Sequence, residues 1–278
     1  MKIIISHDVD WITAWEHKTD FRIPSFIVRG LTEFALGHAS LLEFMGRIQS
    51  IFRNSWQNIN KLMEFDKAKG VPATFFVAVS QGRGLSYSLD NAKAWINAIQ
   101  ENGFDVGLHG IAFEDYSEIQ REREIFKEIS KTEKFGIRVH GVGVGKASLK
   151  LTRDNLELFD QAGYLFSSNT FTVVSPYKAG GIWEFPVHMM DSDLLCQNKK
   201  YQCVTYEGAK ERTQRLFDES RKKGVKYFSL LFHDTRFNDN FMVAKKWYIW
   251  FVEHCIENKL PFISYRDAVR ELEAFHHD

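Results

Sequence analysis

Residues 2–10 read KIIISHDVD, a short apolar run that ends in polar and charged side chains. A run of this length is typical of a buried β-strand. Asp8 and Asp10 are two positions apart, so on an extended strand both carboxylates point the same way. The stretch therefore predicts a strand that delivers a pair of carboxylates to one end of a sheet.

Further apolar runs along the chain end in polar side chains in the same way. They are FDVGLH (His109), FGIRVH (Arg138 and His140), FPVHMMD (His188 and Asp191) and FSLLFHD (His233 and Asp234). Polar groups at the exits of parallel strands mark where α/β barrels and open sheets build their sites. We therefore expect these side chains to gather in one cleft. The alternative is that strand-end histidines merely cap a surface.

The segments between these runs carry helix signals. After Asp90, apolar residues recur three and four positions apart up to Ile99, and Gly103 then ends the predicted helix. Units of helix, glycine and strand recur along the chain, which implies crossover connections and a mostly parallel sheet. Strand candidates begin near residues 2, 73, 104, 136, 164, 182, 227 and 261. About eight strands are enough to close a barrel.

Residues 11–55 interrupt this alternation of strands and helices, between the first strand and the helix that leads to the second strand. The segment is apolar with a helical period, and we interpret it as a helical insertion. It forms either a lid or partner surface over the exit of the first strand, or an ordinary packing element. Its polar positions, Arg29, Glu33, Glu43 and Arg47, lack the basic bias of helices that lie on membranes.

The composition favours a globular protein without a nucleic-acid partner. Lys and Arg number 36 and so do Asp and Glu, so no net charge draws the chain to nucleic acid. The cysteines Cys196, Cys203 and Cys255 form no CxxC pair, which argues against a disulfide framework and a thiolate zinc site. The start of the chain does not read as a signal peptide, and no apolar run approaches the ~20 residues of a spanning helix. We therefore expect a cytoplasmic protein without a transmembrane segment.

The residues at the strand ends supply what metal-assisted hydrolysis needs. One carboxylate of the Asp8 and Asp10 pair, together with His109, offers donors that suit zinc and related divalent cations. A bound cation polarises a carbonyl group and lowers the pKa of bound water toward neutrality. The other aspartate then accepts the proton of that water, and Arg138 pairs with this aspartate and keeps it ionised. With His233 to protonate the leaving nitrogen, the set predicts hydrolysis of an amide.

The motifs ISHDVD, VPATFFV, DVGLH, GIRVH and SLLFH, in this order, resemble those of the polysaccharide deacetylase superfamily (NodB homology, carbohydrate esterase 4). The DxD form of the first motif, the insertion after it and the stretch EFPVHMMDSDLL look more like its O-antigen branch, the WbmS-like deacetylases. The resemblance covers the chain from Lys2 to about Ala268. It implies a single domain over residues 1–278 with the 11–55 insertion. The implied fold is α/β, a distorted (β/α) barrel of about seven to eight parallel strands.

The resemblance also implies roles for individual residues. Asp8 looks like the catalytic base of the family, and Asp10 and His109 look like its metal ligands. Arg138 looks like the arginine that braces the base. His233 looks like the general acid. These roles agree with the chemistry expected from the residue types alone.

One position departs from the family pattern. A second metal histidine is expected four residues after the first, and this chain has Phe113 there. The third ligand would then come from Asp115, His7 or His140, from water, or be missing. We assign His7, His140 and Asp234 to substrate binding.

We therefore predict a metal-dependent hydrolase, with zinc as the expected metal, that removes N-acetyl groups from a sugar or glycan. The expected setting is the synthesis of a surface polysaccharide of the O-antigen type. One alternative is that the same residues hydrolyse another small amide. Another is a non-catalytic carbohydrate-binding or scaffold protein on the same fold. The joint presence of Asp8, Asp10, Arg138 and His233 favours an enzyme, whereas Phe113 favours the binding protein.

Overall fold

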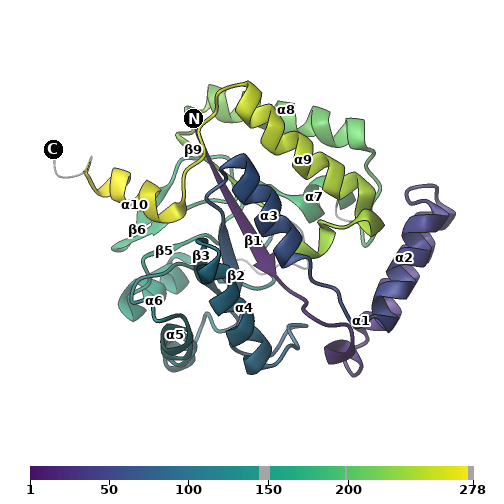
Figure 1. Ribbon diagram of the computed structural model, residues 1–278. Coiled ribbons are helices and arrows are strands. Elements are labelled where there is room, and N and C mark those ends of the chain that lie inside the picture. The colour runs from purple at the N-terminus through teal and green to yellow at the C-terminus, as the bar shows by residue number, and fades with distance from the viewer. Residues whose placement is uncertain (144–150, 198, 275–278) are drawn as a thin grey trace.

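The computed structural model of the protein describes residues 1–143, 151–197 and 199–274. In these residues nine strands form one curled sheet in the order β6-β7-β5-β4-β3-β2-β1-β9-β8 (Figure 1). The strands are β1 (Lys2–Val9), β2 (Thr74–Val77), β3 (Asp105–Gly110), β4 (Ile137–Val139), β5 (Phe166–Ser167), β6 (Tyr177–Ala179), β7 (Ile182–Glu184), β8 (Met189–Met190) and β9 (Tyr227–Leu231). Within the described sheet, only β6 and β7 pair antiparallel.

The predicted α/β fold with a mostly parallel, barrel-like sheet is confirmed. The sheet is a half-barrel rather than a closed one, because β6 and β8 form its two edges. One predicted strand is wrong: near residue 261 the backbone makes a single bridge, between Phe262 and Ile3. The run is cut short there because α10 begins at Tyr265 and leads the chain away from the sheet. The strand that pairs with β9 at the edge of the sheet is β8.

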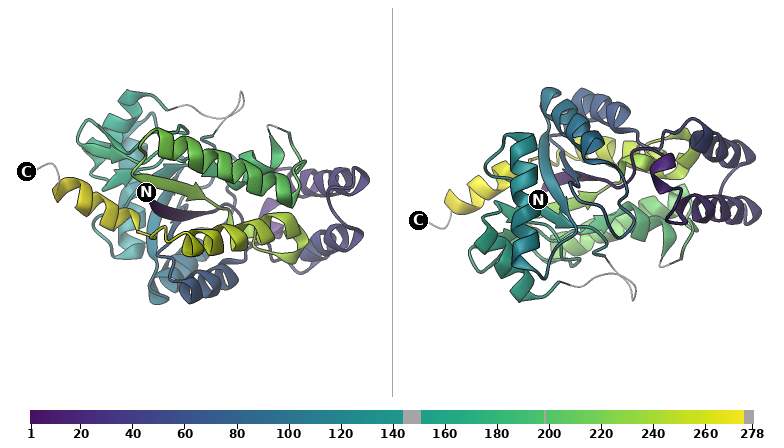
Figure 2. Two further views of the ribbon diagram at one scale, coloured as in Figure 1. Left: turned by 90° about the horizontal axis from the view of Figure 1, so that it is seen from above. Right: turned by 90° about the horizontal axis from the view of Figure 1, so that it is seen from below.

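The helices surround this sheet (Figure 2). They are η1 (Trp15–His17), α1 (Arg22–Ala35), α2 (Leu41–Phe52), α3 (Ile59–Lys69), α4 (Leu89–Glu101), α5 (Tyr116–Ser130), α6 (Arg153–Ala162), α7 (Asp191–Cys196), α8 (Tyr206–Lys222), η2 (Asp234–Arg236), η3 (Asp239–Phe241), α9 (Met242–Glu257) and α10 (Tyr265–Ala274). Helix α4 shows how local sequence directs the packing. The Ser88 hydroxyl caps its first turn, and its face with Ile96 and Ile99 is buried against the core. Gly103 follows its end with a φ of 86°, a left-handed value that glycine adopts without strain.

Between β1 and α3 the chain forms η1, α1 and α2, and the two α-helices project from one side of the body (Figures 1 and 2). Ser40 and Glu43 form a capping box that starts α2. Buried Glu33 of α1 binds Arg47 of α2 and holds the helices together. Several apolar side chains of this region are exposed, namely Phe21, Val28, Leu31, Leu36, Leu42, Met45 and Phe52. Throughout the described residues, each helix is too short or too polar to cross a lipid bilayer.

Candidate active site

The site is built at the carboxyl ends of four strands of the sheet, β4, β3, β1 and β9, with β2 between β3 and β1. Asp8 is the second-last residue of β1, and Asp10 directly follows the strand. His109 and Arg138 are register partners on β3 and β4, so these strands present both residues at the same level. His233 follows β9, which pairs with β1 on the side away from β2. Because all these strands run parallel, their ends meet at one edge of the sheet.

Asp10, His109 and His140 form a compact cluster of possible metal ligands. Asp10 Oδ1 lies 3.2 Å from His109 Nε2 and 3.3 Å from His140 Nδ1, and the two nitrogens are 3.0 Å apart. In a tetrahedral zinc site with bonds of the usual length, ligand atoms are about 3.3 Å from one another. The three donors therefore have the spacing and the chemistry that a zinc ion requires. His140 belongs to this cluster rather than to a separate substrate site.

The hydrogen bonds of His109 show why a cation fits between these three atoms. Its Nδ1 lies 3.0 Å from the carbonyl oxygen of Arg138, to which it donates, so Nε2 of the neutral ring keeps a lone pair. This lone pair faces a carboxylate oxygen of Asp10, and two acceptors at that distance repel each other unless a proton or a metal ion lies between them. Burial alone would lower the pKa of His109, but the charges of Asp8 and Asp10 raise it. The site thus attracts positive charge to the position where a metal would bind.

The carboxylate of Asp10 stays ionised in this setting. Burial would raise its pKa, but His140, His109 and His233 outweigh burial and hold the pKa well below its usual value. Phe113 does not take part, since it is buried with the Arg83 guanidinium 4.6 Å from its ring centre. His140, from the end of the neighbouring strand, thus stands where the family pattern led us to expect a second histidine of the same strand-loop segment.

Asp8 is held beside this cluster by Arg138. The fully buried Arg138 donates from Nη1 to Asp8 Oδ1 at 2.9 Å and to Ser6 Oγ at 2.8 Å. Its other N–H groups donate to the carbonyl and hydroxyl oxygens of Ser168 and to the Tyr265 hydroxyl. The second oxygen of Asp8 lies 3.8 Å from His109 Nε2. This oxygen adjoins the ligand cluster without belonging to it, which leaves it available for proton transfer.

His233 is held on another side of Asp10 by a buried carboxylate. Its Nδ1 donates to Asp191 Oδ1 at 2.7 Å, and its backbone N–H donates to Asp191 Oδ2 at 2.9 Å. The free Nε2 lies 3.6 Å from Asp10 Oδ2. Burial opposes protonation, but the charge of Asp191, aided by Asp10 and Asp8, raises the pKa of His233 to about 10. The ring is therefore an imidazolium that can donate a proton from Nε2.

Asp191, the last residue of the run FPVHMMD, was expected to lie in the cleft but had no predicted chemical role. The end of an apolar run was the available signal, but it did not show which residue Asp191 would face. Its partner His233 is 42 positions away, and the pairing of β8 with β9 brings them together.

Two residues predicted to bind substrate do not reach the site, and those predictions are wrong. The ring of His7 is fully buried, and its nitrogens are 2.9 Å from the Phe232 carbonyl and 2.9 Å from an Asp66 carboxylate oxygen. Asp234 is also fully buried, where it accepts the backbone N–H of Asn58, and burial raises its pKa to about 8. Successive strand side chains point to opposite faces, so His7 faces away from Asp8.

Asp115, one of the possible third ligands, has a different task. Its carboxylate accepts the backbone N–H groups of Ser117 and Glu118 and so caps the start of α5. It is thus occupied as a helix cap.

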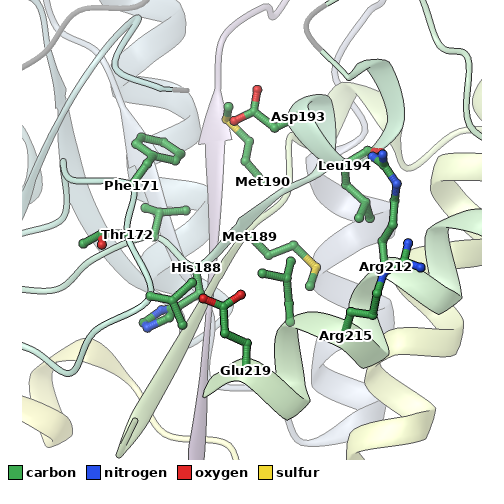
Figure 3. A pocket seen from close by; sticks show the side chains of 13 residues that line it. Phe171, Thr172, His188, Met189, Met190, Asp193, Leu194, Arg212, Arg215 and Glu219 are labelled. Carbon is green, nitrogen blue, oxygen red and sulfur yellow. The ribbon is translucent and has the colours of Figure 1, made fainter. Parts of the chain in front are cut away.

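A cavity of about 240 Å³ opens beside Asp10 and His233. Residues of the helical insertion close it, among them Trp11 and Phe26. A larger hollow of about 530 Å³ lies elsewhere, between β8, α7 and α8 (Figure 3). Its described lining comes from residues 171–173, 187–190, 193, 194, 212, 215, 216 and 219, so it is separate from the Asp10, His109 and His140 cluster. We therefore take the smaller cavity as the substrate site.

Known proteins share parts of this sequence and the fold. A family model described as polysaccharide deacetylase matches residues 51–141, which include His109 and His140. The crystal structure of Puue allantoinase is similar with a TM-score of 0.61 at 13% identity, over 99% of this chain and 90% of that one. A probable polysaccharide deacetylase from Pseudomonas aeruginosa PAO1 is similar with a TM-score of 0.57 at 13% identity, over 96% and 88% of the two chains. No curated protein sequence matches the chain.

At these identities the structural likeness concerns the fold, whereas the family match concerns the sequence itself. The family match includes the second and third strand-end motifs, and the fold carries the remaining ones to the same edge of the sheet. Residues 51–141 are thus similar in sequence to the polysaccharide deacetylase family, and nearly the whole chain shares the fold of a probable polysaccharide deacetylase.

Proposed function

We propose that this protein is a metal-dependent deacetylase that hydrolyses the N-acetyl group of a sugar, with zinc as its metal. One observation carries the proposal: two separate proton-transfer pairs adjoin the same ligand cluster. Asp8 with Arg138 lies next to His109, and His233 with Asp191 lies next to Asp10. A protein that only binds a glycan has no need for a braced base and a braced acid around three metal donors.

The reaction follows from the protonation states of these groups. Asp10, His109 and His140 would hold a divalent ion, which would supply the Lewis acidity that polarises an amide carbonyl and makes water more acidic. Asp8 accepts a proton from the water whose oxygen bonds to the acetyl carbon, and Arg138 keeps Asp8 oriented toward it. His233 donates its Nε2 proton to the amide nitrogen as the carbon–nitrogen bond breaks. The products are acetate and the free amine of the sugar.

The setting we propose is the cytoplasmic synthesis of a surface polysaccharide of the O-antigen type. The DxD form of the first motif and the insertion after β1 support the WbmS-like branch of the superfamily. The size of the cavity, about 240 Å³, suits a monosaccharide unit better than a long polymer bound along a groove. The same size leaves a second candidate, hydrolysis of another small amide by the same residues.

The proposal is tested by acetate release. The purified protein, loaded in turn with zinc, cobalt and manganese, is incubated with N-acetylated sugars, nucleotide-linked ones first. We expect Asp8→Asn and His233→Ala to lower the rate by about 10²–10⁴-fold, the usual effect of losing a general base or acid. Asp218→Asn and His254→Ala, on the outer helices α8 and α9, serve as matched controls. Full activity in both active-site variants would refute these roles, and an inert wild-type protein on every N-acetylated sugar would refute the proposed function.

A further inference from the structure

The cavity beside Asp10 and His233 contains an unusual concentration of arginine. Four arginines line it: Arg22, Arg29, Arg47 and Arg236. The chain as a whole has equal numbers of basic and acidic residues, so this concentration is local. Three of the four come from α1 and α2, the helices of the insertion, and Arg236 comes from η2.

The acidic residues around the cavity do not balance these charges. Glu33 serves two arginines, with contacts of 2.9 Å to Arg29 and 2.5 Å to Arg47. Asp191 is shared between His233 at 2.7 Å and Arg236 at 3.5 Å. Asp10 is the third carboxylate at the cavity, so among the described residues three carboxylates stand against four arginines and the His233 imidazolium.

Arg22 adds a further positive charge near the surface. Its guanidinium donates to the backbone carbonyl of Arg83 at 3.0 Å. It also lies 6.0 Å from the ring centre of Trp11, which lines the same cavity. Among the described contacts of this guanidinium, a neutral carbonyl and an aromatic ring supply no counter-charge.

Two of the buried guanidinium groups keep N–H groups that nothing satisfies. In the part of the chain that the structure describes, Arg47 Nη2 and Arg236 Nη1 are buried without a hydrogen-bond partner. Arg47 is only 2% exposed and Arg236 8%, so the protein excludes most water from them. Burial lowers the pKa of Arg47 despite its pairing with Glu33. Burial would also lower the pKa of Arg236, but Asp191 and Cys196 outweigh it and raise that pKa. Unpaired buried donors are costly, and charged ones most of all.

We propose that this cavity binds an anionic group of the substrate, a phosphate or a carboxylate, through Arg47 and Arg236. This inference rests on the proposed function and specifies it: the substrate is an acidic N-acetylated sugar rather than a neutral glycan. Guanidinium groups present paired N–H donors that match the oxygens of both anions. Because His233 and Asp10 line the same cavity, the anion lies on the sugar that carries the acetyl group or on the group joined to it.

A purely structural role explains only part of this arrangement. Arg47 Nε donates to the Asn240 carbonyl at 2.8 Å and thereby fastens α2 to η3. Together with the Glu33 pair, this bond accounts for two of its N–H groups but leaves Nη2 unused. Arg236 likewise contacts Asp191 through Nε and leaves Nη1 unused. Both arginines line the cavity, so an anion bound there would lie beside the side chains that carry these unused groups.

Calorimetric titration tests the proposal on the zinc-loaded protein. The probes are N-acetylglucosamine 1-phosphate and inorganic phosphate, with neutral N-acetylglucosamine for comparison. We expect Arg47→Met and Arg236→Met each to weaken binding of the phosphorylated sugar about 10- to 100-fold, the worth of one charge-assisted hydrogen bond, and to leave binding of the neutral sugar unchanged. Arg53→Met, at the end of the same helix α2, is the matched control and should bind as wild type does.

Two further measurements keep the test decisive. Arg22→Met, at the partly exposed rim, and Arg47→Lys, which keeps a charge beside Glu33, should fold even if Arg47→Met does not, and each should weaken binding of the phosphorylated sugar. The titration is repeated on protein dialysed free of metal. If the phosphorylated sugar no longer binds without the metal, and if its affinity is the same in every arginine variant, then the metal itself binds the phosphate. This result would overturn the proposal.

Activity then separates this inference from the proposed function. Acetate release is compared for a uridine diphosphate-linked sugar, a polyprenyl phosphate-linked sugar, an N-acetylated uronic acid and neutral chitobiose. Preference for one acidic substrate, lost in Arg236→Met, supports the inference and identifies the source of the anion. Equal kcat/KM for chitobiose and the acidic sugars would overturn it. Arginine-dependent anion binding without any acetate release would support the anion site and refute deacetylation.

Discussion

His188 provides a sharp test of how the interior of this protein is held together. The ring is 7% exposed and stacks on Phe228 with a centroid distance of 5.0 Å. Its Nδ1 accepts the backbone N–H of Ser229 at 3.1 Å, and its Nε2 donates to the Val174 carbonyl at 3.0 Å. Protonation would place a hydrogen on Nδ1, directly against the N–H of Ser229. The structure therefore requires the neutral ring, and burial lowers the pKa of His188 to about 4.

The pH dependence of stability follows from this pKa. In the unfolded chain the ring titrates near 6.5, so between that value and about 4 the unfolded state binds the extra proton. The contribution of His188 is thus complete above pH 6.5 and is lost as the pH falls through this window. Each pH unit in the window corresponds to about 1.4 kcal/mol. We expect a loss of about 2 kcal/mol between pH 7.5 and pH 5, and about 3 kcal/mol in full.

Urea unfolding, followed by tryptophan fluorescence at several pH values, measures this loss. Carboxylates also titrate in this range, so the useful quantity is the difference between the wild-type protein and His188→Gln. Glutamine accepts and donates at similar positions but does not titrate, so the wild-type protein should lose about 2 kcal/mol more than this variant between pH 7.5 and 5. His38→Gln, whose half-buried ring lies at the turn between α1 and α2, is the control and should follow wild type. Parallel curves for wild type and His188→Gln would refute the reasoning.

Three further predictions concern the site. His140→Ala should weaken zinc binding by more than about 100-fold in competition with a chromophoric chelator, because a ligand is lost; unchanged affinity would exclude His140 as a ligand. Asp191→Asn should lower kcat by about 10²–10⁴-fold at unchanged zinc content, because one amide oxygen cannot accept both N–H groups of His233. Steady-state kinetics with metal analysis measures this, and an unchanged kcat would contradict the prediction. Arg138→Met should lower the free energy of unfolding by about 3–5 kcal/mol, because it leaves Asp8 buried and unpaired; a loss below about 1 kcal/mol in urea would contradict the proposed pairing.

The strands and the residues at their ends were predictable because the signals for them are local. The apolar run 2–10 and the run ending at His109 are strands in the structure, and the helix-glycine-strand units form crossovers of a parallel sheet. The inward position of His7 was also within reach of the sequence. A strand alternates its faces, so a residue next to Asp8 cannot share its direction. His7 lies near the end of β1, but on the face opposite to that of Asp8.

Tertiary structure decided the partners of the site residues. Phe113 and His140 both follow strands, and only the register of β3 with β4 shows that His140 meets His109 and Asp10. Asp191 and His233 are 42 positions apart, and their pairing depends on β8 lying beside β9.

For the cavity lined by Arg22, Arg29, Arg47 and Arg236, too, the sequence determined one part and the tertiary structure another. The sequence by itself determined a parallel α/β sheet with carboxylates and histidines at its strand ends, since apolar runs and side-chain periods act over a few residues. It also showed Arg29 and Arg47 on a helical insertion, but as part of a mixed polar face. Only the packing of α1 and α2 against the strand ends brought them to Arg236 and His233. Such contacts join residues far apart in the chain, and their geometry depends on the curl of the whole sheet rather than on any local pattern.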